Sequence, residues 1–410
     1  MQRVVITGIG AISALGTGAD TNFSAAFAGR SGIGPVEISA GPHRITGCAA
    51  QIGFDLPELV RKADLPLFDR VALLAWSAAS EALQQAGMDP DPAAQQSSGV
   101  FWGTGMGGAQ TIDNGYVDLF IEQKNRVRPM SIVASMNNAS AAQIALRAGF
   151  GGSVNTYSSA CVSSAQAIGE AFRHIRHGYA ERVLAGGSEA LLTVGIWRAW
   201  EALRVLGVTD ADHPERTCKP FSLDRSGLVL GEAGAAVMLE SLESAQRRGA
   251  TILAELAGYG ASNDATHMTK PDPAGQARAM RMALREAGLA PDRIDYINAH
   301  GAGTLAGDLA ETQSIREVFG DHAAALMVSS TKAVHGHTLG AAGALEFVLA
   351  VQALRQQAVP PTAFLAQPDP ACDLDYVALH GRAQQSLRAV MSNSFAFGGS
   401  NAALIAIPFI

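Results

Sequence analysis

Two stretches decide the fold, and each joins a short apolar strand to a helix of small residues. Residues 157–175 read YSSACVSSAQAIGEAFRHI, and residues 328–351 read VSSTKAVHGHTLGAAGALEFVLAV. A strand that ends in a Gly-rich turn stands upstream of each stretch, in VFWGTGMGG from Val100 and in YINAHGAGT from Tyr296. Because the order and approximate spacing repeat, we expect two similar halves, residues 1–250 and 251–410, packed into one compact body.

Strands and helices alternate along the rest of the chain. Helical spacing of apolar residues predicts helices over residues 68–86 and 340–355. Strands are expected over residues 3–7, 99–103, 154–160, 182–186, 235–239, 252–256, 294–298, 327–330, 389–393 and 402–407. Several of these runs are continuously apolar, which is typical of sheets buried on both faces. The pattern predicts an α/β architecture in which helices cover the sheets.

The composition excludes several classes of protein. Of the 410 residues 48% are hydrophobic and only 16% are charged, which excludes a disordered chain. A net charge of −7 argues against a nucleic-acid partner. The four cysteines form no CxxC pair, so we expect neither disulfides nor a metal site but a reducing cytoplasm. We expect no membrane span, and we interpret the apolar N-terminus as a buried strand rather than a signal peptide.

Cys161 stands where a strand gives way to a helix. A thiol at a helix N-terminus is close to the positive end of the helix dipole, which favours the reactive thiolate. Small neighbours such as Ser159, Ala160 and Ser163 leave room for a substrate. The alternative is an inert buried cysteine, which is the usual state of a free cysteine.

Two histidines follow strands in Gly-rich turns, where site residues of open α/β sheets lie. His300 follows the strand before GAGT, and His337 lies in KAVHGHTLGA. Lys332 is in a small, apolar setting where burial needs a partner, and Glu311 is a candidate partner. A metal at His335 and His337 is disfavoured because a third ligand is missing nearby.

A Gly-rich turn near the C-terminus is the last candidate, in SNSFAFGGSNAAL from Ser392. Phe397 and the two glycines after it predict either a plain hairpin turn or a flap that donates backbone N–H groups to an oxyanion.

Taken together, these segments resemble the β-ketoacyl-acyl carrier protein synthase family, the elongating type of the thiolase-like fold. The resemblance covers essentially the whole chain. Its specific pieces are SSACVSSAQAIGEA around Cys161, AGGSEA at Ala185, KPFSLDRSGLVLGEAG at Lys219, NAHGAGT at Asn298, SSTKAVHGHTLGAAGALE at Ser329 and NSFAFGGSNA at Asn393. The resemblance implies a five-layered αβαβα body of two homologous halves, and a dimer.

The resemblance also implies an acyltransferase that forms 3-oxoacyl chains by decarboxylative Claisen condensation. Cys161 would carry the acyl group, His300 and His337 would bind the enolate of malonyl-acyl carrier protein, and Lys332 with Glu311 would set the field around His300. The implied oxyanion donors are the N–H groups of Cys161 and Phe397. No cofactor is implied beyond the phosphopantetheine of the acyl carrier protein.

Other roles are implied for residues around this centre. The residues implied are Thr269 and Thr304 for the pantetheine arm, Met106, Trp200, Asn137 and Asn138 for the acyl pocket, and Arg204, Arg61 and Lys62 for the acidic carrier protein. For Arg204, Arg61 and Lys62 the alternative to a binding role is that of ordinary solvated surface charges.

The chain departs from the family pattern at a few positions. Ala302 stands where the family usually carries Thr or Ser, and Asn137 and Asn138 stand where it carries apolar residues. WEALRVL at Trp200, Ala396, HGH at His335 and PDPACDLD at Pro368 resemble synthases of dedicated acyl pathways, such as nodulation signals, polyenes or polyketides. General fatty-acid elongation is the alternative pathway, and a biosynthetic thiolase lacks support because the C-terminal turn has no cysteine.

The assembly also has alternatives. A homodimer is expected, and pairing with a chain-length partner is the other possibility. The chain could itself be such a non-catalytic partner, but these usually lack the nucleophile that Cys161 provides.

Overall fold

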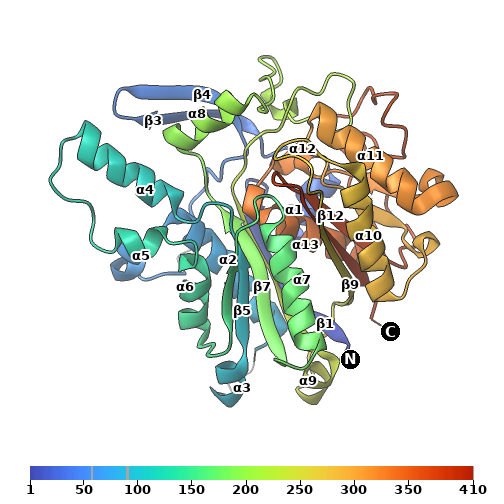
Figure 1. Ribbon diagram of the computed structural model, residues 1–410. Helices are drawn as coiled ribbons and strands as arrows, with labels where there is room; N and C mark the ends of the chain where they lie inside the picture. Colours follow the sequence, from blue (N-terminus) through green and yellow to red (C-terminus); the bar gives the residue numbers. More distant parts are fainter. Residues whose placement is uncertain (57–58, 89–91, 410) are drawn as a thin grey trace.

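The computed structural model describes residues 1–56, 59–88 and 92–409 (Figure 1). The strands are β1 (Val4–Ser13), β2 (Gly16–Thr17), β3 (Gly34–Ala40), β4 (His43–Ala49), β5 (Gly99–Gly103), β6 (Val154–Tyr157), β7 (Arg182–Glu189), β8 (Ala233–Ser241), β9 (Ala254–Asn263), β10 (Tyr296–Asn298), β11 (Met327–Ser329), β12 (Val390–Phe395) and β13 (Ser400–Ile407). Each strand expected from an apolar run is present, with ends that differ by a few residues. The hairpin of β3 and β4 was not expected.

The α-helices fill the connections between these strands. They are α1 (Ala19–Phe27), α2 (Arg70–Ala86), α3 (Pro92–Ser97), α4 (Ala109–Tyr116), α5 (Ser131–Ser135), α6 (Ala139–Ala148), α7 (Ser163–Arg176), α8 (Val194–Leu203), α9 (Leu242–Arg247), α10 (Pro273–Ala287), α11 (Leu305–Phe319), α12 (Lys332–His335) and α13 (Ala342–Gln356). The two predicted helices correspond to α2 and α13. No helix in the described part of the chain is long and apolar enough to cross a bilayer.

The large sheet repeats one strand order twice. The first half runs β1-β8-β7-β5-β6, and the second runs β9-β13-β12-β10-β11. In both halves the first two pairings are antiparallel and the last two are parallel. The halves meet where Val5 and Ile6 of β1 pair with Glu255 and Ala254 of β9. This topology confirms the internal repeat that the sequence predicts.

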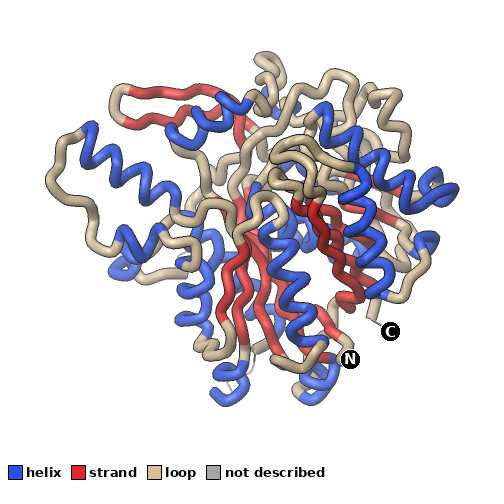
Figure 2. Tube along the Cα trace, in the orientation of Figure 1, coloured by secondary structure: helices blue, strands red, loops and turns tan. Residues whose placement is uncertain are grey.

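The helices complete a five-layered αβαβα body of the thiolase-like kind. α7 contacts β7 and β9, and α13 contacts β8 and β12, so these two helices lie between the halves of the sheet (Figures 1 and 2). α2 covers β1 and β8 from outside, and α10 covers β9 and β13. Residues of α13 are buried from Ala342 to Leu354, as expected for a central helix that is apolar on all sides.

Glycines let the outer helix α2 lie directly on β1. A Cβ at Gly10 would lie 2.1 Å from the carbonyl oxygen of Ala78 on α2, and a Cβ at Gly8 would lie 2.0 Å from that of Ala82. Side chains at these positions would push α2 away from the sheet. The need for such close contacts accounts for part of the high glycine content of 44 residues.

This packing predicts the effect of a single methyl group. Gly10→Ala should lower the free energy of unfolding by about 1–3 kcal/mol, because the backbone of α2 must move. Gly34→Ala is the matched control, because a Cβ at Gly34 has nothing within 4 Å. Urea unfolding of both variants measures the difference, and equal stability of the two would contradict the packing argument.

Candidate active site

Cys161 lies in the turn between β6 and the central helix α7. The turn is held by the hydroxyl of Ser163, which accepts a hydrogen bond from Ser159 N–H (2.9 Å) and donates one to the Ala160 carbonyl (2.6 Å). Ala160 has a positive φ of 53°, an uncommon backbone conformation for alanine. The strained turn places the Cys161 side chain, 5% exposed, just before the first turn of α7.

His337 is the nearest partner of the thiol. Its Nε2 lies 3.0 Å from Cys161 Sγ, and its Nδ1 accepts a hydrogen bond from the Leu339 N–H at 3.3 Å. A neutral imidazole with an acceptor Nδ1 carries its proton on Nε2. His337 therefore points an N–H donor at the sulfur.

His300 stands beside His337 at the end of β10. The two rings meet edge to face, with centroids 5.3 Å apart and an interplanar angle of 83°. The Glu311 carboxylate accepts the backbone N–H groups of His300 (2.9 Å) and Gly301 (2.7 Å), and Lys332 Nζ donates to the His300 carbonyl at 2.5 Å. The backbone that carries His300 is thus fixed by two buried charged groups.

The ion-pair partner of Lys332 is Glu346, not Glu311. Lys332 and Glu346 are both fully buried and form a salt bridge and hydrogen bond. The expected pair with Glu311 is wrong because both carboxylate oxygens of Glu311 are taken by backbone amides, while α13 brings Glu346 directly to the ammonium group. Glu346 is a functional residue that the sequence reasoning missed, although GALE after His337 contains it.

Burial decides the protonation of the two histidines. Desolvation holds the pKa of both His300 and His337 well below the usual value, and the positive charge of Lys332 lowers both further. Both rings are neutral at physiological pH. They can donate hydrogen bonds to a developing negative charge without being acids themselves.

Burial also has the largest effect on the pKa of the Cys161 thiol. Desolvation raises the pKa of Cys161 to about 12, and the charge of Lys332 acts in the opposite direction. Burial therefore opposes the thiolate, which the helix N-terminus was expected to favour.

A pocket leads from the surface to these three residues. It has a volume of about 170 Å³, and Cys161, His300 and His337 line it together with Thr269, Thr304, Trp200 and Phe397. The predicted pantetheine residues and one predicted acyl-pocket residue thus share a cavity with the predicted catalytic residues. Thr269 is exposed, whereas Thr304 is partly buried.

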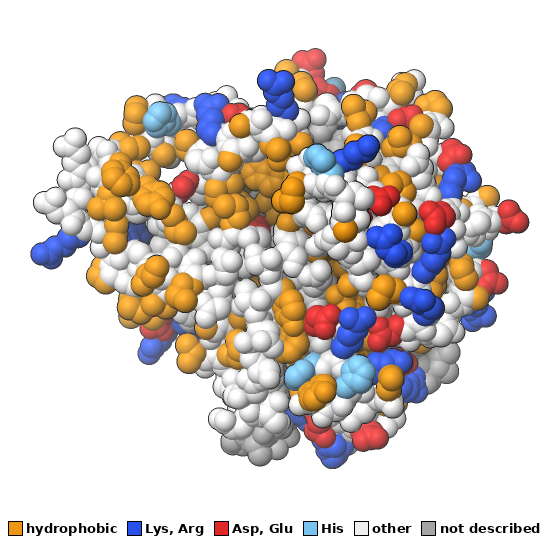
Figure 3. Space-filling view, viewed as in Figure 1, with side chains coloured by type: hydrophobic (Ala, Val, Ile, Leu, Met, Phe, Trp, Pro, Cys, Tyr) orange, Lys and Arg blue, Asp and Glu red, His pale blue; other side chains and the backbone are white. Residues whose placement is uncertain are grey.

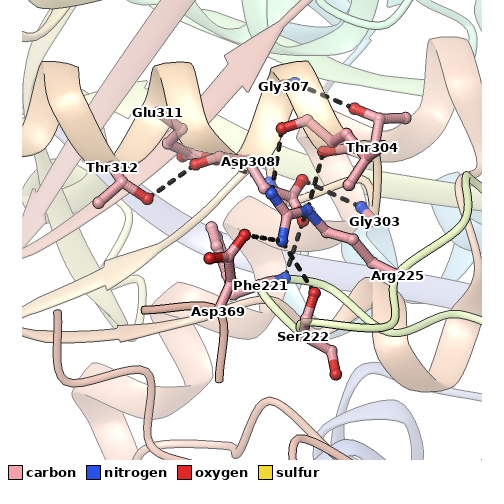
Figure 4. Close-up of polar contacts among 12 residues, drawn as sticks. Phe221, Ser222, Arg225, Gly303, Thr304, Gly307, Asp308, Glu311, Thr312 and Asp369 are labelled. Atoms are coloured by element: carbon pink, nitrogen blue, oxygen red, sulfur yellow. Dashed lines mark hydrogen bonds and ion pairs between the residues drawn. The ribbon is translucent and has the colours of Figure 1, made fainter. Parts of the chain in front are cut away.

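Thr304 begins α11 and is held from behind by a buried network (Figure 4). Its Oγ1 accepts from the Gly307 N–H at 3.2 Å, and its carbonyl accepts from Arg225 Nε at 3.3 Å. The Asp308 carboxylate accepts the N–H groups of Gly303 (3.1 Å) and Phe221 (2.8 Å). Arg225 and Asp308 were not singled out from the sequence, although Arg225 stands in the conspicuous charged segment LDRSG.

Phe397 lies in the turn between β12 and β13, as expected for a hairpin, and its role as an oxyanion donor stays a prediction. Its ring stacks on Trp200 with centroids 6.1 Å apart, and its N–H makes no hydrogen bond to another described residue. The Gly398 N–H donates to the Met268 carbonyl at 2.7 Å, which ties the turn to the loop that carries Thr269. The Phe397 N–H is therefore free to bind a ligand oxygen.

Other predicted residues lie away from this pocket. Met106, Asn137 and Asn138 are exposed and do not line it. Asn137 packs on Gly107, where a Cβ would lie 2.6 Å from Asn137 Oδ1, and Asn138 immediately precedes α6. These residues share one surface with the projecting segment of α4 and α5.

The predicted basic contacts fall into two places. Arg204 is exposed and ends α8, the helix that also carries Trp200, so it lies near the pocket. Arg61 bonds to Asp64, and Lys62 begins the 3₁₀ helix η1 (Lys62–Leu67), which contacts α5. Arg61 and Lys62 are on the side of Asn137 rather than at the pocket.

Within the residues that the structure describes, no group of three or more His, Cys, Asp or Glu side chains is arranged to hold a metal ion. The two ring nitrogens of His335 are within hydrogen-bond distance of the Gly336 carbonyl (2.8 Å) and Thr331 Oγ1 (3.0 Å). His335 therefore fixes the turn before His337.

Comparison with known proteins agrees with this geometry. Residues 1–245 match the β-ketoacyl synthase N-terminal domain, and residues 253–365 match its C-terminal domain. The chain is 43% identical over 404 residues to nodulation protein E of Rhizobium sp. (strain N33), covering 98% of each chain. It is 40% identical over 408 residues to 3-oxoacyl-[acyl-carrier-protein] synthase 2 of Coxiella burnetii (strain RSA 493 / Nine Mile phase I), again covering 98% of each.

Solved structures are similar over the full length. A type II polyketide synthase acyl carrier protein in complex with its ketosynthase, bound to the hexaketide, contains a chain that is 31% identical with a TM-score of 0.90. The ishigamide ketosynthase/chain length factor is 31% identical with a TM-score of 0.92, and both matches cover 100% of both chains. The chain belongs to the β-ketoacyl synthase family.

The charge of Lys332 can be tested at the thiol. Lys332→Met removes the positive charge that lowers the Cys161 pKa, so alkylation of Cys161 by iodoacetamide at fixed pH should slow by roughly tenfold per unit of pKa rise. Intact mass spectrometry gives the rate, and Cys161→Ala identifies the site. Lys124→Met, an exposed lysine paired with Asp118, should leave the rate unchanged. Unchanged or faster alkylation of Lys332→Met would show that the lysine does not act on the thiol.

Proposed function

We propose that this chain is a 3-oxoacyl-[acyl-carrier-protein] synthase, which condenses an acyl group with malonyl-acyl carrier protein and releases CO₂. One observation carries the proposal. A thiol and two neutral imidazoles converge at the inner end of one pocket, with Cys161 Sγ 3.0 Å from His337 Nε2 and His300 edge-on to His337.

In the first half-reaction Cys161 takes the acyl group. The sulfur attacks the thioester of the acyl carrier protein, the carrier leaves as its thiol with the proton that Cys161 loses, and an acyl-Cys161 thioester remains. The His337 N–H and the α7 N-terminus stabilise negative charge that develops on the sulfur. The N–H groups of Cys161 and Phe397 bind the oxyanion of the tetrahedral intermediate.

In the second half-reaction malonyl-acyl carrier protein occupies the same pocket. Its C–CO₂ bond breaks, CO₂ leaves, and the electron pair becomes an enolate whose oxygen accepts N–H bonds from His300 and His337. Neutral imidazoles suit this role because the enolate needs donors rather than a proton source. The enolate carbon attacks acyl-Cys161, and the sulfur leaves and regains a proton. The product is two carbons longer.

The same proposal assigns the surrounding residues. Burial keeps both imidazoles neutral and the charge of Lys332 adds to this effect, while Glu311 and Lys332 fix the backbone of His300. Thr304 and Thr269 line the pocket along the path of a phosphopantetheine arm, so we assign them to that arm. The chemistry needs no cofactor other than the arm that the substrates bring.

The protein partner that we propose for this chain is an acidic acyl carrier protein. A similar structure has its carrier protein bound to the ketosynthase. With a net charge of −7, this chain must dock such a partner through local basic residues, and Arg204 is the best placed. Arg61 and Lys62 remain weaker candidates because they are remote from the pocket. We expect neither nucleic acid nor a membrane as a partner.

The exposed apolar face over α4 and α5 supports a dimer (Figure 3). Its most exposed large side chains are Tyr116 (58%), Phe120 (75%) and Ile132 (73%), and Met106 and Asn137 lie beside it. Contiguous exposed apolar patches mark protein interfaces. A second copy seated here would complete an acyl pocket from Met106, Asn137 and Asn138. A chain-length partner is the alternative, as in the ishigamide ketosynthase/chain length factor.

The pathway proposed is a dedicated one, for a lipid signal, polyene or polyketide. The identity of 43% to nodulation protein E supports it, and the identity of 40% to a 3-oxoacyl-[acyl-carrier-protein] synthase 2 keeps general elongation as the alternative. A purely non-catalytic partner is disfavoured by the complete Cys161 site. The cytoplasm suits the buried free cysteines of the described chain.

The two half-reactions should fail separately, because they have different transition states. Cys161→Ala should abolish acyl-enzyme formation and condensation but leave measurable CO₂ release from malonyl-acyl carrier protein. His300→Ala combined with His337→Ala should lower CO₂ release by at least about 10²-fold, as loss of oxyanion donors does, while some acylation of Cys161 survives. Radiolabelled CO₂ and intact mass measure the two steps. A double variant that decarboxylates at the wild-type rate would refute the assigned roles.

The docking proposal has its own measurement. Arg204→Glu should raise KM for acyl carrier protein substrates by roughly three- to tenfold and weaken the salt dependence, because a rim charge acts on encounter. A small thioester mimic that lacks the carrier should be used as well as before. Arg247→Glu, at the opposite end of the molecule on α9, is the matched control (Figure 1). Equal losses with both substrate types would make Arg204 a structural residue.

A further inference from the structure

A buried carboxylate connects a loop of the first half of the chain to a turn of the second half. Glu189 ends β7, and its side chain is fully buried. It accepts hydrogen bonds from Thr104 Oγ1 (3.2 Å) and from the N–H groups of Gly105 (2.6 Å), Met106 (3.4 Å) and Gly340 (3.0 Å). No lysine or arginine of the described chain forms a salt bridge with Glu189.

The contact leaves no spare space. A Cβ at Gly340 would lie 2.3 Å from the Gly105 nitrogen and 2.5 Å from Glu189 Oε2, and a Cβ at Gly105 would lie 2.6 Å from the same oxygen. The loop after β5 and the turn η6 (Leu339–Ala341) therefore approach closely at their backbones and share this carboxylate. One loop belongs to the first half of the chain and the other to the second.

Each of the two loops carries or contacts a residue that the sequence analysis singled out. The loop after β5 carries Met106 and packs on Asn137 through Gly107. In the turn η6, Gly340 follows Leu339, whose N–H donates to His337 Nδ1 at 3.3 Å and so sets the tautomer of that ring. Movement of Gly340 would release the bond that keeps the His337 proton on Nε2.

Glu189 also acts on the thiol by its charge. The ionisable groups that face Cys161 are Lys332, Glu346 and Glu189, beside the neutral His300 and His337. The negative charge of Glu189 raises the pKa of Cys161, whereas Lys332 lowers it. Burial raises the pKa of Glu189 itself to about 7, against the backbone N–H groups that bind its ionised form.

We propose that Glu189 is a positioning residue for the condensation, which locks the turn after His337 to the Met106 loop and so keeps the His337 N–H aimed at the reacting atoms. The proposal rests on the proposed function. It separates the two half-reactions, because attack by Cys161 needs the sulfur and the oxyanion donors, whereas enolate binding needs a correctly aimed His337. Loss of the carboxylate should therefore harm CO₂ release more than acylation.

Two variants separate the effect of the negative charge of Glu189 from the effect of its side-chain length. Glu189→Gln removes the charge and replaces one accepting oxygen with an NH2 group that faces backbone N–H donors. It should lower CO₂ release by about 10- to 100-fold, keep acylation of Cys161 within about threefold, and move iodoacetamide alkylation of Cys161 to lower pH. Glu189→Asp keeps the charge but shortens the arm. It should lower CO₂ release while the pH profile of alkylation stays in place.

Glu81→Gln is the matched control for a merely structural anchor. Glu81 likewise accepts two backbone N–H groups, of Ala11 and Ala19 at 2.8 Å each, but it lies on α2 and binds β1 and α1 rather than the turn after His337. This variant should lower the melting temperature and leave the ratio of CO₂ release to acylation and the alkylation profile unchanged.

Clear results would overturn the proposal. CO₂ release within about twofold of wild type in both Glu189 variants would do so, as would equal losses of CO₂ release and acylation with an unmoved alkylation profile. If Glu189→Gln does not fold, Glu189→Asp decides the question alone. Failure of the proposed function would look different, because the wild-type protein would then release no CO₂ while the alkylation profiles could still be compared.

Discussion

The ion pair between Lys332 and Glu346 is the interaction on which the site depends. Burying each charge costs several kcal/mol, so neither residue is tolerable without the other. The ammonium group donates a hydrogen bond to the His300 carbonyl. Its positive charge adds to the effect of burial on the pKa of both imidazoles and opposes the effect of burial on the pKa of the thiol. Its partner comes from the N-terminal part of α13, which explains why the central, otherwise apolar helix contains a glutamate. One buried pair thus links the deepest layer of the fold to the chemistry at the pocket.

The internal repeat explains how the site is assembled from distant parts of the sequence. α7 and α13 occupy equivalent places between the two halves of the sheet, and both begin at the same pocket. The turn before α7 supplies Cys161, and the turn before α13 supplies His337. Because the halves repeat in topology but differ in these turns, one half provides the nucleophile and the other provides the donors. The Glu189 carboxylate then connects the loop after β5 to the turn η6 that follows His337.

Much of this arrangement could be predicted from the sequence. Apolar runs identified the strands of the large sheet because both faces of these strands are buried. Cys161, His300 and His337 were candidates from their places in turns, and the family resemblance assigned their roles. The β3–β4 hairpin was missed, since only a few residues such as Val36 and Ile45 are buried in it. The partner of Lys332 and the effect of burial on the Cys161 pKa could not be predicted, because both depend on which buried groups meet across the halves. Met106, Asn137 and Asn138 belong to an exposed face, so a single chain does not test their assignment.

The shared core has a consequence for how the chain is made. The largest apolar cluster combines Ile6, Phe172 and Val237 of the first half with Phe347 and Leu404 of the second. On the ribosome the first half emerges well before α13 exists, so the inner face of its sheet and the sides of α7 stay open to solvent until synthesis is nearly complete. The native fold has many contacts between residues far apart in sequence. A chain that has not yet formed these contacts exposes apolar surface and aggregates readily. Expression of either half alone would leave this apolar surface uncovered, and the full chain is expected to benefit from chaperones that shield it.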